Sequence, residues 1–160
     1  MPNAKALSLI GSIIEVLAVL GLLLHASLLL ATWNLLPESI PVHFNFAGQP
    51  DAWGAKTELL LLLALSSLIY LGLSWLARHP QKLNYPWQIT ERNRARQYAL
   101  AVCLLRVLKL QSVCLFAFIS LQMIGVSLGF SNGLGYLFTP VAVLVTLATV
   151  MGYFVLASRS

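Results

Sequence analysis

The chain has 160 residues, of which 59% are hydrophobic and only 9% are charged, and its mean hydropathy is +0.83. Soluble domains are charged at about a quarter of their residues, and disordered chains combine low hydrophobicity with high net charge, so both classes are excluded. The net charge is +5, but seven of the ten Lys and Arg residues lie between Arg78 and Lys109. Such clustering is typical of cytoplasmic loops, so we expect a small polytopic membrane protein and no nucleic-acid partner.

Four apolar segments are long enough to cross a bilayer as helices, which takes roughly 20 residues each. The helical pattern from Glu91 to about Leu128 exceeds what a hydrocarbon core of about 30 Å can hold, so its first half should project into the cytoplasm or lie along the headgroups. We therefore predict an all-α integral membrane protein with four transmembrane helices, one structured non-cytoplasmic loop and a long third helix extending into the cytoplasm. The apolar segments are residues 7–33, 58–76, 110–130 and 134–156.

The distribution of positive charge predicts the orientation in the membrane. Residues 78–97 hold five basic side chains and one acid, whereas residues 34–57 hold two acids and one basic side chain. Because cytoplasmic loops collect Lys and Arg, we expect both termini in the cytoplasm and residues 34–57 outside a multi-pass cell-membrane protein. The predicted cytoplasmic basic face comprises Arg92, Arg94 and Arg96. At 100° per residue, Arg106 lies within about 80° of Arg92 and Arg96 around the predicted helix. This face contacts anionic lipid, docks a partner or is simply solvated.

The loop before the second helix carries most of the chemistry outside the apolar segments. Its prolines exclude a helix, and the alternation of Val42, Phe44 and Phe46 predicts an extended strand. On that geometry His43 and Asn45 share the opposite face, about 6.6 Å apart. The composition of residues 48–51 predicts a turn, and Asp51 is suited to an Asx turn. The predicted outward binding surface comprises Glu38, His43, Asn45, Asp51 and Lys56.

This loop also carries a family resemblance. Residues 36–56 read Leu-Pro-x-x-Ile-Pro-x-His-Phe-Asn-x-x-Gly-x-Pro-Asp-x-Trp-Gly-x-Lys, which resembles the signature loop of the SdpI family. Those are bacterial membrane proteins named for immunity to a secreted sporulation-delaying toxin. The resemblance implies an N-terminal module at residues 1–76, with two transmembrane helices around the loop. Residues 77–160 then add the basic loop and two further helices, as in short four-helix forms, and the whole folds as one membrane domain.

Several functions are compatible with this loop. The favoured hypothesis is non-enzymatic binding, immunity or sensing, with membrane lipids and a peptide toxin or another membrane protein as partners. An alternative is a metal-dependent membrane enzyme or transporter that uses His43 and Asp51, although dedicated zinc sites usually offer three or four strong ligands. Ser39 would complete a nucleophilic triad, but no elbow or oxyanion motif accompanies it. A third hypothesis is an accessory subunit that docks through the basic face. The sequence leaves the cofactor unknown and implies none strongly.

Polar residues inside the apolar segments are functional candidates, because charged groups are costly within a bilayer. Glu15 should pair with Lys109 or Arg106 on the third helix, and His25 lies at the predicted depth of Gln122. Gly125 and Gly129 form a small-xxx-small pair that permits close helix contact within the chain or between copies. A homo-oligomer is therefore an open alternative.

Overall fold

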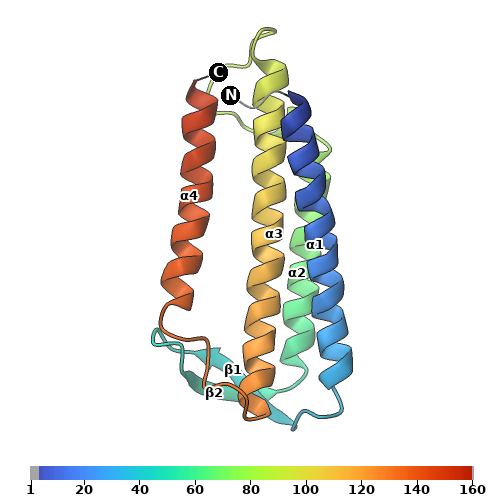
Figure 1. The fold of residues 1–160 in the computed structure, drawn as a ribbon, viewed down its shortest axis with the longest axis vertical. Coiled ribbons are helices and arrows are strands. Elements are labelled where there is room, and N and C mark those ends of the chain that lie inside the picture. The colour runs from blue at the N-terminus through green and yellow to red at the C-terminus, as the bar shows by residue number, and fades with distance from the viewer. Residues whose placement is uncertain (1–3, 160) are drawn as a thin grey trace.

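Four long helices run side by side and a two-stranded sheet closes one end of the bundle (Figure 1). The computed structural model describes the backbone of residues 4–159 and the side chains of residues 9–159. Both ends of the described chain lie at the end of the bundle opposite the sheet (Figure 1). The elements are α1 (Ala4–Thr32), β1 (Ser39–Phe44), β2 (Pro50–Ala55), α2 (Glu58–Ala77), the 3-10 turn η1 (Pro80–Lys82), α3 (Arg94–Ser127) and α4 (Phe138–Ser158).

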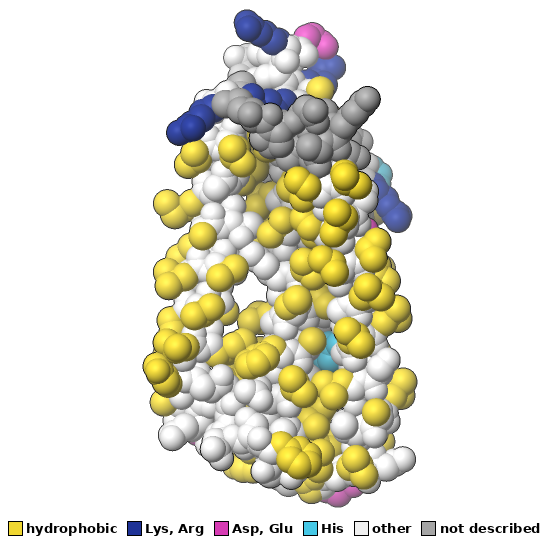
Figure 2. All heavy atoms as spheres, viewed as in Figure 1, with side chains coloured by type: hydrophobic (Ala, Val, Ile, Leu, Met, Phe, Trp, Pro, Cys, Tyr) yellow, Lys and Arg dark blue, Asp and Glu magenta, His cyan; other side chains and the backbone are white. Residues whose placement is uncertain are grey.

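All four helices are long and apolar enough to cross a membrane, which indicates a multi-pass membrane protein. Apolar side chains cover the middle of the molecule, whereas basic side chains gather at the end that holds the termini (Figure 2). Helix α3 is central, since it packs against α1, α2 and α4 and reaches β1 at its far end. Helix α4 packs chiefly against α3 and stands apart from α1 and α2 (Figure 1).

Helix α3 begins at Arg94 rather than at Glu91 as predicted. The side chains of Thr90 and Asn93 each accept a hydrogen bond from the other residue's backbone N–H, at 3.3 and 2.8 Å, and this closes a turn before the helix. Arg92 therefore lies outside the helix, and the predicted helical face shared by Arg92, Arg96 and Arg106 is wrong. The 34 residues of α3 still span about 51 Å, more than the hydrocarbon core.

The loop between α1 and α2 forms a β-hairpin, so the protein is mostly rather than entirely helical. Strands β1 and β2 are antiparallel, with Ser39 opposite Ala55 and Ile40 opposite Gly54. Register shifts flank His43, which pairs with Ala52. β1 ends at Phe44, because the chain turns back after two closing hydrogen bonds between residues 45 and 49 and between residues 48 and 45. The side chain of Phe46 is consequently 95% exposed instead of continuing the apolar face.

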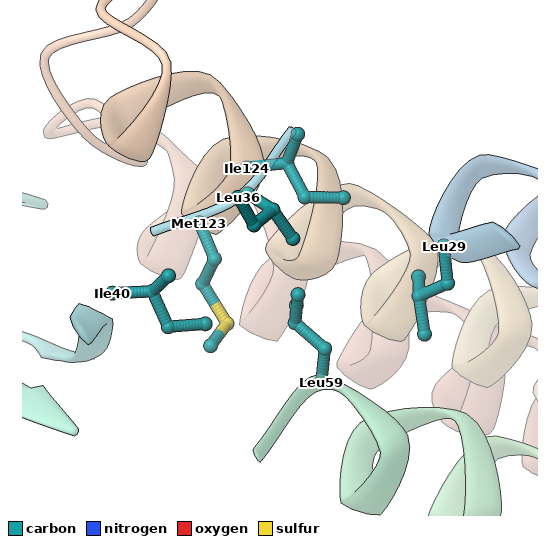
Figure 3. Close-up of a cluster of buried hydrophobic side chains, with 6 residues drawn as sticks. All are labelled: Leu29, Leu36, Ile40, Leu59, Met123 and Ile124. Carbon is teal, nitrogen blue, oxygen red and sulfur yellow. The ribbon is translucent and has the colours of Figure 1, made fainter. Parts of the chain in front are cut away.

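The base of the hairpin is held by a small apolar core (Figure 3). Ile40 of β1 and Leu36 just before it are 0% and 5% exposed. They pack with side chains from α1, α2 and the end of α3, so one cluster joins the hairpin to three helices (Figure 3). Burying each such side chain contributes about 1.5–3 kcal/mol, which is enough to stabilise a hairpin that would be only marginally stable alone. The helical members of this cluster are Leu29, Leu59, Met123 and Ile124.

The tip of the hairpin is held by a second contact, with the link between α3 and α4. Gly48 has φ +75° and its carbonyl accepts a hydrogen bond of 2.8 Å from the backbone N–H of Leu134. A Cβ at Gly48 would lie 2.5 Å from the carbonyl oxygen of Gly135. The tip thus requires glycine both for its left-handed backbone and for its close approach to the link.

Replacing Gly48 by alanine should destabilise the protein by about 1–3 kcal/mol, because it combines backbone strain with a clash against the link. Thermal unfolding in detergent measures the loss. Gly72→Ala is the matched control, since Gly72 lies within α2 and a Cβ there would meet no atom within 4 Å, so this variant should be neutral or slightly stabilising. Equal stabilities of the two variants would show that the tip is not docked.

Candidate functional site

An exposed histidine and aspartate pair lies across the hairpin. Nδ1 of His43 on β1 is 2.5 Å from Oδ1 of Asp51 on β2, and the two side chains are 67% and 41% exposed. The carboxylate occupies one ring nitrogen and thereby orients the imidazole, which leaves Nε2 as the nitrogen available to a ligand. The pair is formed by two strands that are anchored at both base and tip, so its geometry is supported by the bundle.

Asn45, predicted as a strand residue beside His43, instead builds the turn. Its side-chain oxygen accepts hydrogen bonds from the backbone N–H groups of Ala47 and Gln49, at 2.9 and 3.0 Å. The Asx turn therefore belongs to Asn45, and the expectation that assigned it to Asp51 is wrong. Both residue types suit such turns, and the position of the strand end decides which one is used.

Glu38 and Lys56 close the base of the hairpin. Lys56 Nζ is 2.9 Å from Glu38 Oε1, and its backbone N–H donates to the Glu38 carbonyl at 3.2 Å. Lys56 is only 18% exposed and its ammonium lies 5.5 Å from the centre of the Trp33 ring. Among the predicted surface residues, Asn45 and Lys56 thus serve the hairpin itself, while His43 and Asp51 face outward together.

Metal binding and nucleophilic catalysis have weak geometric support here. Within the described residues, no three or more His, Cys, Asp or Glu side chains converge on a common point. His43 and Asp51 are the two members of one hydrogen-bonded pair rather than part of a larger ligand set. Ser39 lies four residues from His43 along β1, about 13 Å away in an extended strand, so these residues do not form a triad.

Helices α1, α2 and α3 share a buried ionic cluster. The predicted ion pair is present, with Lys109 Nζ 2.5 Å from Glu15 Oε2. Lys109 also donates to Ser74 Oγ at 2.9 Å and lies 4.5 Å from the centre of the Tyr70 ring, while the Tyr70 hydroxyl donates to Glu15 Oε1 at 2.7 Å. The cluster joins α1, α2 and α3. The contribution of α2 is not predicted from the sequence, although Tyr70 and Ser74, four residues apart, share one face of that helix.

His25 bonds to the predicted helix but to a different residue. Its Nε2 lies 2.8 Å from Ser120 Oγ, and both side chains are buried. Gln122 instead donates from Nε2 to the carbonyl of Gly133 at 2.9 Å. Two residues along a helix rotate a side chain by about 200°, so Ser120 faces α1 while Gln122 faces the link before α4.

The remaining sequence features have structural partners. A Cβ at Gly125 would lie 3.0 Å from the Ser131 side chain, so its close contact in the described structure is with the chain's own link. Gly129, two residues after the end of α3, has φ +80°. At the other end of the bundle, Arg94 pairs with Glu91 at 2.5 Å.

Burial, with smaller effects of neighbouring tyrosines, raises the pKa of Tyr85 in the basic loop to about 12. The phenol therefore stays neutral and donates to the Pro80 carbonyl at 2.9 Å.

Comparison with known proteins singles out the hairpin region. A family model described as a domain of unknown function, DUF1648, matches residues 20–66, which run from the middle of α1 through the hairpin into α2. An uncharacterized protein of Archaeoglobus fulgidus is 37% identical over 65 residues, which cover 36% of this chain and 36% of that protein. The chain thus matches little more than a third of this relative. No solved structure matches it.

Replacing Lys109 by methionine should destabilise the bundle by about 3–5 kcal/mol, because Glu15 loses its hydrogen-bonded ion-pair partner. The double variant Glu15→Gln with Lys109→Met should recover most of that loss, since neither position of the pair then keeps a charge that has lost its partner. Unfolding titrations of the wild type, both single variants and the double variant complete the cycle. Additive losses would contradict a coupled pair.

Proposed function

We propose that the protein is a non-enzymatic membrane receptor that recognises a peptide outside the cell through its hairpin, in an immunity or sensing role. The exposed pair of His43 and Asp51 carries the proposal. Nε2 of His43 is free to hydrogen-bond a ligand, while Asp51 holds the ring in place. Recognition commonly resides on exposed segments that a rigid scaffold positions.

The surroundings of the pair favour a peptide that presents both apolar and polar groups. Phe46 and Trp53 are 95% and 56% exposed on the same hairpin. Exposed aromatic side chains are enriched where proteins bind one another, because they offer a large contact area with little conformational freedom to lose. An imidazole and a carboxylate add polar contacts with defined direction. A peptide with an apolar side chain beside a hydrogen-bonding group satisfies both.

Charge supports an outward orientation of the hairpin. The loop between α2 and α3, which holds several basic residues, lies at the opposite end of the bundle beside the termini (Figure 1), where Lys and Arg side chains gather (Figure 2). Under the positive-inside rule that end is cytoplasmic and the hairpin faces outside. The resemblance of residues 36–56 to the SdpI loop supports an immunity role against a secreted peptide, and it supports a bacterial cell membrane as the location.

The alternative functions have less support. A metal enzyme or transporter needs more ligands than His43 and Asp51, and the described residues bring no third acidic, thiol or imidazole group to them. An accessory subunit that docks through Arg92, Arg94 and Arg96 loses part of its basic face, because Arg94 is neutralised by Glu91.

A selection of phage-displayed peptides on the protein in lipid nanodiscs tests the proposal. Peptides that bind the wild type should bind His43→Ala at least about tenfold more weakly, because a hydrogen bond to a charged or polarised group contributes about 1.5–3 kcal/mol. Asp51→Ala should weaken binding in the same direction through loss of ring orientation.

Gln49→Ala is the control, because Gln49 is exposed on the same hairpin and its side chain makes no hydrogen bond in the described structure. Its peptide affinities should equal those of the wild type. If no selected peptide distinguishes the wild type from the His43 variant, the hairpin pair is not a recognition site and the proposal fails.

A further inference from the structure

Arg106 lies near the buried cluster and has no acidic partner of its own among the described residues. It lies three residues before Lys109 on α3, so both side chains are on similar faces of the helix. Lys109 is neutralised by Glu15. Arg106 is close enough to act electrostatically on Glu15, but it makes no hydrogen bond or ion pair with Glu15 or with any other residue that the structure describes. The cluster therefore carries one positive charge more than its acid neutralises.

A glycine on α1 makes room for this side chain. Gly11 is buried, and a Cβ there would overlap Arg106 Nη1 and lie 3.2 and 3.3 Å from its Cζ and Cδ. The guanidinium thus lies directly on the α1 backbone, in a position that any larger residue at Gly11 would obstruct. This fit restricts the side chain, so the five N–H donors have a defined place rather than the mobility of a surface arginine.

The depth of this position matches a lipid interface. Gly11 lies 21 residues before Thr32 in α1, which is about 31 Å along the helix axis. Thr32 ends the helix next to Trp33, an aromatic residue of the kind found at membrane interfaces, at the hairpin end. A hydrocarbon core is about 30 Å thick, so Arg106 meets α1 at the opposite boundary, beside the phosphate groups of that leaflet.

We propose that Arg106, held against Gly11 between α1 and α3, binds the phosphate of an anionic phospholipid in the leaflet on the side of the termini. Guanidinium groups bind phosphate through two parallel hydrogen bonds, and an unpaired charge at this depth requires a counter-ion. The excess positive charge of the cluster, together with the basic residues of the preceding loop, favours an anionic over a zwitterionic headgroup. This site is independent of the proposed hairpin function, because it lies at the other end of the bundle.

Native mass spectrometry of the 160-residue protein, titrated with phosphatidylglycerol or phosphatidylcholine in detergent, tests the site. The wild type should retain one phosphatidylglycerol at least tenfold more tightly than phosphatidylcholine. Arg106→Gln should lose that preference about tenfold, whereas Arg92→Gln should keep it, because Arg92 is exposed and precedes α3.

Gly11→Ala gives a second, charge-conserving test. It keeps the arginine but obstructs its position, so it should also weaken phosphatidylglycerol retention, and it decides the matter if Arg106→Gln fails to fold. Retention that is unchanged in the variants that fold, or equal retention of the two lipids by the wild type, overturns the proposal. Displacement of the lipid by millimolar inorganic phosphate would identify a site for a free anion and would equally overturn it.

Discussion

The ion pair between Lys109 and Glu15 is the interaction on which the arrangement of the first three helices depends. A charge within the hydrocarbon region needs a partner, and Lys109 is 1% exposed. The hydrogen bonds that its ammonium donates, together with its contact with the Tyr70 ring, connect α1 and α2 to α3. Apolar packing alone does not specify such an arrangement in a membrane, because lipid tails are as apolar as leucine. The polar cluster therefore supplies the specificity of the bundle.

The position of α3 in turn determines where the hairpin sits. Met123 and Ile124, close to the end of α3, form part of the apolar floor on which Ile40 packs. The link that follows α3 then receives the hairpin tip at Gly48. Because the hairpin is held at both ends by elements that α3 positions, the polar pair on its exposed side is displayed by a scaffold rather than by a mobile loop.

Parts of this arrangement can be predicted from the sequence. The four helices follow from apolar length alone, because few other structures satisfy their backbone groups in lipid. The partner of Glu15 follows from matching depths and opposite charges. In contrast, the partner of His25 is Ser120 rather than Gln122, because hydropathy gives the depth of a residue but gives the helix rotation only roughly.

The hairpin shows a second limit of prediction. The alternation predicts a strand, but it does not reveal where the strand ends, so Phe46 is predicted on the apolar face and is in fact exposed. The choice between Asn45 and Asp51 as the turn residue depends on the same boundary. The matched family model covers residues 20–66 and has no stated function, so only the contacts of the hairpin indicate its chemistry.

Display of the hairpin outside the cell is the claim on which the receptor hypothesis depends, and cysteine labelling tests it most directly. The two native cysteines, Cys103 and Cys114, are first replaced by alanine or serine. A membrane-impermeant maleimide should then label Gln49→Cys in intact cells and should label Gln81→Cys, in the basic loop, only after the cells are opened. The reverse pattern would place the hairpin in the cytoplasm and contradict the role proposed for it.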